Sequence, residues 1–301
     1  MPTRRVGVRR ARIRWRAALA ALLATLLLAG CASAHGRSSD AAAPTAGSAS
    51  PARSSHYPSS MVALGDSGAT GYDSDPASPG ADASQNSWAA GTNPAVRSIY
   101  SRLLAVDPAI RGHASNVAVD GSDVTALAAQ VDTALKSRPT PELFLIQSVD
   151  NDLRCDGTDA KNSGPFGQHL TAVLQHIARS APHADILIVS SPWATAANYT
   201  AVAATSADGR SANSGSGPCN AFSPDGKPQP AHVAYAESVT RHYLAELEQR
   251  CKTVPQCRYD GGALHAMRIT AADLSPDFRH LSIAGPAKQA AVEWTVLSSK
   301  Y

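Results

Sequence analysis

A serine, an aspartate and a histidine in this sequence have the types and setting of a nucleophilic site. Ser67 ends the motif Gly65-Asp66-Ser67 directly after the apolar run Met61–Leu64, where a strand-to-loop turn can present its hydroxyl outward. A serine hydroxyl needs a nearby base, and that base needs a group that fixes its tautomer. Asp277, three residues before His280, can orient that histidine within one loop. Each feature alone also fits a structural role, as an N-capping serine in a turn or a surface histidine.

Two further residues can donate hydrogen bonds to an oxyanion. Asn151 follows the apolar run Leu143–Val149, and its side-chain amide can act as such a donor. Gly121 precedes a helical pattern, and its backbone N–H would be a second donor. An Asx turn at Asn151 and a glycine that merely opens a helix are the structural alternatives.

These residues are positioned by apolar runs that alternate with helical patterns. The expected strands cover Met61–Leu64, Ser115–Val119, Leu143–Val149 and Ile186–Val189, with a weaker fifth around Leu264–Ile269. The expected helices cover Asn93–Val106, Ser122–Leu135, Phe166–Ala178, His232–Leu247 and Ile283–Leu297. This alternation predicts an α/β domain with a mostly parallel sheet. The candidate residues that follow strands should then meet at the carboxyl edge of the sheet, where such sheets bind ligands.

Two long segments rich in small and polar residues, Asp73–Trp88 and Ser191–Pro230, interrupt the alternation. Segments of this length in a compact domain are usually functional or disordered. Each follows an expected strand, so we expect both at the same carboxyl edge.

Taken together, the chemical motifs resemble those of the SGNH hydrolases, also called GDSL lipases or esterases. The matching blocks are Gly65-Asp66-Ser67, Gly121, Asn151-Asp152 and Asp277-x-x-His280, and the likeness covers about Met61 to Leu297. The resemblance implies a three-layer α/β/α sandwich with a mostly parallel five-stranded sheet of the flavodoxin-like kind. It implies that Ser67 is the nucleophile, His280 the base and Asp277 the group that orients it. It also implies an oxyanion hole made of the Ser67 and Gly121 N–H groups and the Asn151 side chain.

Two positions depart from the family pattern. Val149 stands where the third block usually has glycine, and Leu281 follows His280 where proline is usual. The first departure can alter the turn that aims Asn151, but neither removes a reacting group. The segment Asp150–Cys155 is similar to its counterpart in secreted actinobacterial members of the family.

Residues 1–30 have the make-up of a bacterial lipoprotein signal peptide. Seven arginines precede the apolar stretch Ala17–Gly30, and Leu28-Ala29-Gly30-Cys31 looks like a lipobox, in which Cys31 would carry the lipid. An ordinary secretory signal with a chance cysteine is the alternative, and the pair Arg4-Arg5 leaves the twin-arginine export route open. Residues 31–60, mostly Ala, Ser, Pro and Gly, predict a flexible tether ahead of a domain that spans residues 61–301.

Charge and motif content exclude several other functions. Removing the seven N-terminal arginines turns the formal charge from +3 to −4, so the body is mildly acidic and we expect no nucleic-acid partner. His169 and His176 have no glutamate beside them and do not make a metal site, and no phosphate-binding loop occurs. No apolar run downstream of residue 30 reaches the length of a membrane span, which excludes a multi-span membrane protein.

Four cysteines remain if Cys31 carries a lipid: Cys155, Cys219, Cys251 and Cys257. An even number in an exported protein predicts two disulfides, for which three connectivities are possible. Cys251 and Cys257 enclose a short loop containing a proline, which favours their pairing and leaves Cys155 with Cys219. Four free, buried thiols are the alternative.

These features predict an exported lipoprotein, anchored to the outer face of the cell membrane, whose single domain hydrolyses carboxylic esters through an acyl-enzyme on Ser67. The ester can be a lipid, an acetylated glycan or a small molecule, and acyl transfer to a sugar hydroxyl would use the same residues. The alternative from another class is a non-catalytic envelope-binding protein on the same scaffold, against which the intact set of reacting residues argues. The mechanism needs no cofactor, and we expect a monomer.

Overall fold

The computed structural model describes residues 57–301. The predicted signal peptide (residues 1–30), Cys31 and most of the predicted tether lie outside the described residues. The last residues of the predicted tether pack into the domain, because the Ser59 N–H donates to Glu142 Oε2 at 2.7 Å and Ser60 Oγ donates to the Thr140 carbonyl at 3.0 Å. The folded domain therefore begins ahead of its first strand.

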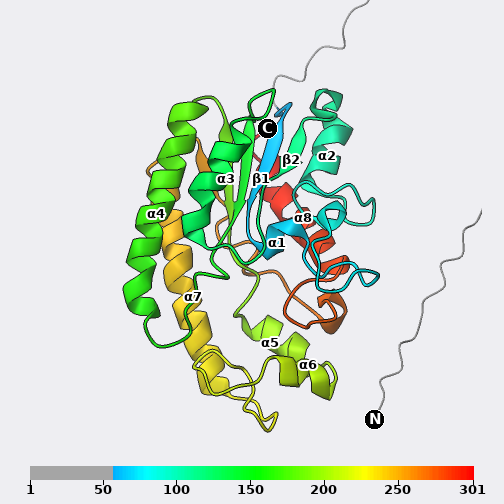
Figure 1. Cartoon of the computed structure of the whole chain (residues 1–301), viewed down its shortest axis with the longest axis vertical. Helices are drawn as coiled ribbons and strands as arrows, with labels where there is room; N and C mark the ends of the chain where they lie inside the picture. The colour runs from blue at the N-terminus through cyan, green and yellow to red at the C-terminus, as the bar shows by residue number, and fades with distance from the viewer. Residues whose placement is uncertain (1–56) are drawn as a thin grey trace, which may run out of the picture. The chain divides into compact units, whose positions relative to one another are not determined.

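Five parallel strands form one sheet in the order β2-β1-β3-β4-β5 (Figure 1). The strands are β1 (Met61–Gly65), β2 (Ala114–Asn116), β3 (Leu143–Gln147), β4 (Asp185–Val189) and β5 (Cys257–Tyr259). This order is that of flavodoxin-like doubly wound folds, in which the strand order reverses between β1 and β3. The carboxyl ends of β1 and β3 therefore border the crevice where such folds bind ligands.

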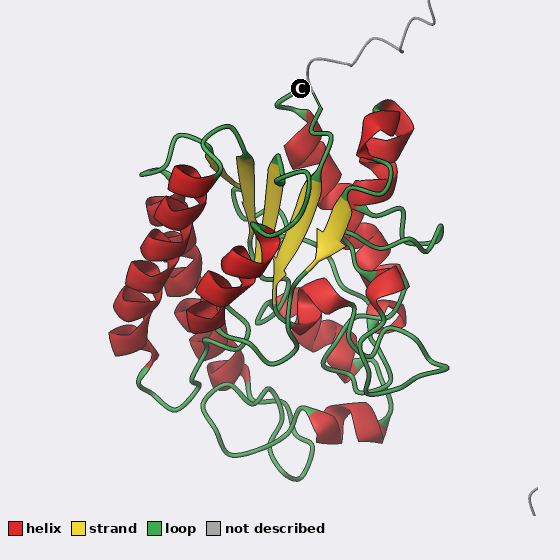
Figure 2. Cartoon of the chain, turned by 45° about the horizontal axis from the view of Figure 1, so that its top comes forward, coloured by secondary structure: helices red, strands yellow, loops and turns green. Residues whose placement is uncertain are grey.

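Helices cover both faces of the sheet (Figure 2). Packed on one face are α3 (Leu127–Ala134), α4 (Asp159–Ser180) and α7 (Pro230–Cys251), and on the other α2 (Ile99–Val106) and α8 (Ala284–Ser298). Successive strand residues enter opposite cores: Val62 packs with α3, α4 and α7, whereas Ala63 packs with α2 and α8. The predicted three-layer α/β/α architecture is confirmed.

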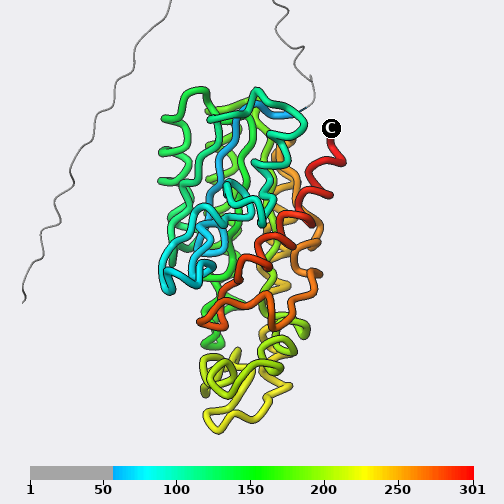
Figure 3. Tube along the Cα trace, turned by 90° about the vertical axis from the view of Figure 1, so that its right-hand side faces the viewer, coloured from blue at the N-terminus to red at the C-terminus, as the bar shows by residue number. Residues whose placement is uncertain are grey.

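Short helices lie beyond the carboxyl ends of the strands (Figure 1). They are α1 (Ser67–Thr70), α5 (Ala196–Ala203) and α6 (Ala207–Ala212), and four single 3-10 turns occur at Ser84–Asn86, Pro108–Ile110, Val124–Ala126 and Ala271–Asp273. Figure 3 shows the segment that carries α5 and α6 extending past the sheet. The two ends of the described chain meet at the opposite edge, where the rings of Tyr57 and Tyr301 lie 4.9 Å apart.

The prediction of a weak fifth strand around Leu264–Ile269 is wrong. The fifth strand is instead β5, three residues long, and the apolar side chains of Leu264–Ile269 are buried in the core under α2 and α8 without forming a strand. Gly261 and Gly262 follow β5 with φ of 69° and 82°, so the chain turns left-handed before the apolar residues begin.

Several element boundaries differ from those expected because local caps decide them. The helix expected over Asn93–Val106 begins only at Ile99, since Ser98 Oγ accepts a hydrogen bond from the Ser101 N–H at 3.1 Å. The helix expected from Phe166 begins at Asp159, whose carboxylate receives the Arg154 and Cys155 N–H groups. The segment Ser191–Pro230, expected as one long loop, contains α5 and α6.

Candidate active site

Ser67 lies at the turn between β1 and α1. Gly65 ends β1 with a φ of 134°, and a Cβ there would lie 1.9 Å from the Gln147 carbonyl oxygen, so only glycine fits between β1 and β3. Asp66 caps α1, because its Oδ1 accepts from the Gly68 N–H at 2.9 Å. The Ser67 N–H, at the first helical position, donates no hydrogen bond within residues 57–301.

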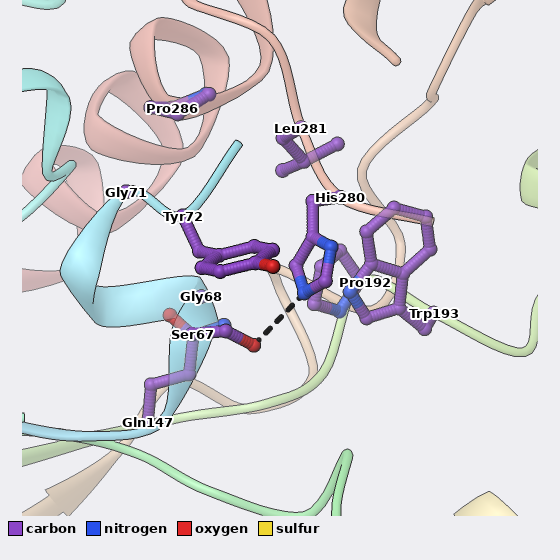
Figure 4. Close-up of a pocket in the computed structure, with 10 residues that line it drawn as sticks. All are labelled: Ser67, Gly68, Gly71, Tyr72, Gln147, Pro192, Trp193, His280, Leu281 and Pro286. Atoms are coloured by element: carbon purple, nitrogen blue, oxygen red, sulfur yellow. Dashed lines mark hydrogen bonds between the residues drawn. The ribbon is translucent and has the colours of Figure 1, made fainter. Parts of the chain in front are cut away.

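The structure brings Ser67, Asp277 and His280 together across more than two hundred residues of sequence. His280 Nδ1 lies 2.6 Å from Asp277 Oδ2, and His280 Nε2 lies 3.0 Å from Ser67 Oγ. Figure 4 shows the Ser67 hydroxyl directed at the imidazole. With Nδ1–H donating to the carboxylate, Nε2 is left as the acceptor that faces the serine hydroxyl.

The pKa values of the acid and the base are shifted in opposite directions. Burial opposes the ionisation of Asp277, but hydrogen bonds from His280, Ser275 and two backbone N–H groups outweigh it and hold the pKa of Asp277 well below its ordinary value. Burial lowers the pKa of His280, yet the hydrogen bond and charge of Asp277 outweigh that effect, and the net pKa is raised. Asp277 is therefore a permanent anion that stabilises the imidazolium form of His280.

The loop Ser275–His280, which carries Asp277 and His280, is tied to elements on both sides. From the segment after α1, Asp73 Oδ2 accepts the Asp277 N–H at 3.0 Å, and the Tyr72 ring lies 4.7 Å from the His280 ring. From α6, the Ala212 carbonyl accepts Arg279 Nε at 2.9 Å. The two long segments Asp73–Trp88 and Ser191–Pro230 thus both make hydrogen bonds to the loop that carries Asp277 and His280.

Two of the predicted oxyanion donors, Gly121 and Asn151, lie at the same sheet edge but do not line the pocket at Ser67. Gly121 has a φ of 71°, and its N–H has no hydrogen-bond partner in the described part of the chain. Next to it, Ser122 Oγ donates to the Gly65 carbonyl at 2.8 Å, and Asn151 Nδ2 donates to the Ser122 carbonyl at 3.0 Å. Asn151 is exposed, and one of its two amide hydrogens is engaged by Ser122.

Val149 adopts the backbone conformation that glycine favours. Its φ is 125° and its side chain is fully buried. A β-branched residue in this region is strained, and such strain persists only where the surroundings impose it. Valine stands here in place of the usual glycine, but the turn ahead of Asn151 therefore keeps the backbone conformation that glycine favours.

Aromatic and apolar side chains surround His280 (Figure 4). The pocket at Ser67 is lined by Tyr72, Gln147, Pro192, Trp193, His280 and Leu281 among others. Its cavity volume of about 20 Å³ leaves room for only a small group. Gln147 Oε1 accepts from Trp88 Nε1 at 2.6 Å and from Gln289 Nε2 at 2.9 Å.

Sequence reasoning missed Asp150, a half-buried acid next to Asn151. Burial raises its pKa to about 6, against the hydrogen bond from Ser191 Oγ and the charges of His280 and His265, which lower it. Its charge contributes to the raised pKa of His280, as does that of Asp120. The only sequence signal was its place between a strand and Asn151. No group of three His, Cys, Asp or Glu side chains among residues 57–301 is arranged to hold a metal ion.

The two disulfides match the pairing that the spacing favours. Cys155 is bonded to Cys219, and Cys251 to Cys257. The first bond joins the loop after β3 to the segment beyond α6, and both cysteines line a cavity with Arg279, the neighbour of His280. The second joins the end of α7 to the start of β5.

Comparison with solved structures identifies chains of the same fold. An extracellular lipase from Streptomyces rimosus is 16% identical with a TM-score of 0.51, over 80% of this chain and 99% of that one. A phospholipase A1 from Streptomyces albidoflavus is 14% identical with a TM-score of 0.50, over 80% and 99% of the two chains. At these identities the likeness shows a shared fold. No protein-family model matches this chain, and no curated protein sequence does either.

Proposed function

We propose that this chain is a serine ester hydrolase of the SGNH type. The observation that carries the proposal is the pair of hydrogen bonds from His280 Nδ1–H to Asp277 Oδ2 and from Ser67 Oγ–H to His280 Nε2, at 2.6 Å and 3.0 Å. They lie within the reach that nucleophilic catalysis by serine requires. The shared fold with a lipase and a phospholipase supports the same assignment.

In the proposed reaction His280 Nε2 takes the proton of Ser67 Oγ as this oxygen attacks the ester carbonyl carbon. The tetrahedral intermediate collapses when His280 returns the proton to the leaving oxygen, which departs as an alcohol. Water then attacks the acyl-enzyme with His280 again as base, and the carboxylic acid is released. Asp277 stays ionised throughout and stabilises the imidazolium that forms at each step.

The oxyanion donors of the proposal are the N–H groups of Ser67 and Gly121 and the side chain of Asn151. Two of these three are unpaired in the described structure, and Asn151 has one amide hydrogen left after its bond to Ser122. Unpaired donors at a strand-to-helix turn suit a developing negative charge.

We also propose that the protein is exported and anchored through a lipid on Cys31. The support is the lipobox-like sequence and the two disulfides, which persist in oxidising compartments. No helix within residues 57–301 is long and apolar enough to cross a membrane.

The proposed activity is tested by p-nitrophenyl acetate hydrolysis with matched serine variants. Ser67→Ala should lower kcat by about 10⁴-fold or more, since the nucleophile is removed while a turn hydroxyl contributes little to packing. Ser180→Ala, at the exposed end of α4, is the control and should retain wild-type rates. Wild-type protein that releases no p-nitrophenol, or a Ser67→Ala protein that stays active, would contradict the proposal.

A further inference from the structure

Trp193 lines two cavities that differ greatly in size. The pocket at Ser67 has a volume of about 20 Å³, and a second cavity, lined in part by Asp150 and Arg279, has a volume of about 360 Å³. Among the described residues that line these two cavities, Trp193 alone is common to both. Figure 4 shows its indole beside the imidazole of His280. The side chain is therefore placed to divide the small cavity from the large one.

The turn that carries Trp193 is held on both sides. Toward β4, the Trp193 N–H donates to Ser191 Oγ at 3.1 Å, and the same hydroxyl donates to Asp150 Oδ1. Toward α5, Ala194 has a left-handed φ of 55°, and the Thr195 side chain caps the helix. A left-handed φ at a residue other than glycine persists where the surroundings impose it. The backbone that carries the indole is thus fixed by contacts at each end.

The two steps of the proposed reaction decide which part of the ester belongs in the small pocket. The alcohol departs before water attacks, so it needs an open route to solvent. The acyl group stays bonded to Ser67 Oγ until the second step and can occupy a confined space. A volume of about 20 Å³ holds roughly one water-sized group. It suits the methyl group of an acetyl ester and excludes a longer chain.

The second cavity has room for an acyl chain of several carbons. Its volume of about 360 Å³ is within the size range of small-molecule sites. Apolar side chains from three places form part of its wall, namely Leu153 after β3, Tyr199 on α5 and Ala236 on α7. A chain attached at Ser67 would reach this space only past Trp193.

We propose that Trp193 sets the length of the acyl group, because its indole closes the pocket at Ser67 off from the larger cavity. The protein is then selective for acetyl esters over esters of longer acids. This inference rests on the proposed ester hydrolysis and specifies its acyl group.

The experiment compares kcat/KM for p-nitrophenyl acetate with kcat/KM for p-nitrophenyl hexanoate, two esters of the same alcohol. The wild-type protein should prefer the acetate. Trp193→Ala should lower the acetate-to-hexanoate ratio by about tenfold or more through faster hexanoate hydrolysis, because a single methylene that a pocket excludes typically changes kcat/KM by about tenfold or more. Trp193→Phe, which keeps a smaller ring, should give a ratio between those of the wild type and Trp193→Ala.

Trp294→Ala is the matched control. Trp294 is also half-buried and packs against the same hydrophobic core as Trp193, but it stacks on Tyr57 and lines neither cavity. Measured well below its melting transition, this variant should keep the wild-type ratio. A ratio that falls equally in both alanine variants would indicate general loosening of the fold and overturn the inference. A wild-type ratio in Trp193→Ala, or a wild-type protein that prefers the hexanoate, would overturn it as well.

A binding measurement keeps the inference separate from the proposed reaction. Ser67→Ala and Ser67→Ala/Trp193→Ala cannot form the acyl-enzyme, so both proteins can be titrated with the intact esters. The double variant should bind p-nitrophenyl hexanoate about tenfold more tightly than Ser67→Ala does, with no such gain for p-nitrophenyl acetate. If the wild-type protein hydrolyses neither ester, the proposed function fails, but this comparison still decides whether Trp193 restricts the chain. Equal affinities of the two proteins for the hexanoate would overturn the inference.

Discussion

His280 is surrounded by acidic groups from several elements. Asp277 contacts it directly, Asp120 lies after β2, Asp150 lies after β3, and the Tyr72 ring packs against it. Their charges raise the pKa of His280 despite its burial. A base with a raised pKa is protonated over more of the acidic range, so the activity should fall as the pH drops through that pKa.

The Asp120→Asn variant tests this electrostatic account. Removing the negative charge destabilises the imidazolium, so the pKa of His280 falls and the acidic limb of the kcat/KM profile moves to lower pH. Asp156→Asn, an exposed acid on the loop before α4, is the control and should leave the limb in place. If the acidic limb of the kcat/KM profile did not move in Asp120→Asn, or moved to higher pH, the assignment of His280 as the base would be contradicted.

The Asn151→Ala variant tests the side-chain donor of the proposed oxyanion hole. If the second amide hydrogen reaches the oxyanion, kcat should fall by about 10²–10³-fold while KM changes little, because the bond matters most when negative charge develops. Steady-state kinetics with p-nitrophenyl acetate measure the changes in kcat and KM separately. A kcat near the wild-type value would leave the Ser67 and Gly121 N–H groups as the donors.

Site residues that belong to a short sequence motif could be predicted from the sequence. Site residues whose properties depend on distant parts of the folded chain could not. Asp277 and His280 lie on one loop, so their pairing is local. Asp150 is notable only because Ser191, 41 residues away, folds over it and donates a hydrogen bond to its carboxylate.

The Cys155–Cys219 disulfide restrains the loop after β3 and the segment that follows α6. These cysteines line a cavity together with Trp193 and Arg279, so the bond limits motion next to His280, where geometry would set the rate of the proposed reaction. Its two cysteines are 64 residues apart in the sequence, whereas Cys251 and Cys257 are only 6 residues apart. By loop-closure entropy the two bonds stabilise the fold by about 4 and about 2 kcal/mol.

Paired serine variants separate these effects. Cys155→Ser/Cys219→Ser should lower kcat/KM at temperatures well below its melting transition, because two loops next to the catalytic histidine loosen. Cys251→Ser/Cys257→Ser should lower the melting temperature and leave kcat/KM near the wild-type value. Equal activity of the two variants, measured far below both transitions, would show that the first bond serves stability alone.

Long apolar runs made the strands β1, β3 and β4 predictable, because residues buried on both faces read as continuous hydrophobic stretches. The edge strand β5 has only three residues, all half-buried, and leaves no such signal. The helices α5 and α6 are short and rich in alanine and small polar residues, so no apolar stripe marks them.

A buried glutamate makes the stability of the whole domain depend on pH. Glu293 on α8 is fully buried, and neither oxygen of its ionised carboxylate accepts a hydrogen bond from residues 57–301, whereas the protonated form can donate to Asp260. Burial, with the nearby charge of Asp260, raises its pKa well above the ordinary value. The protonated form is thus favoured in the folded state, so the free energy of unfolding should decrease as the pH rises from the ordinary glutamate pKa to the raised one.

Glu293→Gln should remove this pH dependence. The neutral amide has no proton to lose, so the variant should be more stable than the wild type at neutral pH and show a flatter profile across the acidic range. Urea unfolding between pH 4 and pH 8 measures both effects. Glu248→Gln, in an exposed pair with Lys252 on α7, is the control and should change the profile little. A steeper decline in the Glu293→Gln variant would contradict the account.

The N-terminal end of the described domain and the site lie at opposite edges of the sheet. The chain reaches the described domain at Tyr57, beside Tyr301, while Ser67 lies at the carboxyl edge of the sheet. If Cys31 carries a lipid, the full-length protein should partition into detergent on phase separation, and Cys31→Ser should remain in the aqueous phase. Wild-type protein found wholly in the aqueous phase, with an N-terminus other than residue 31, would contradict the lipid anchor.

The central claim is that Ser67 is a nucleophile activated by His280. Reaction with a fluorophosphonate, followed by peptide mapping with mass spectrometry, tests it most directly, because this reagent bonds covalently to activated serines whatever the natural ester is. The account predicts a single adduct on the peptide that carries Ser67, strongly reduced in His280→Ala and absent in Ser67→Ala. An adduct on another serine, or labelling of Ser67 at the same rate in His280→Ala, would contradict it.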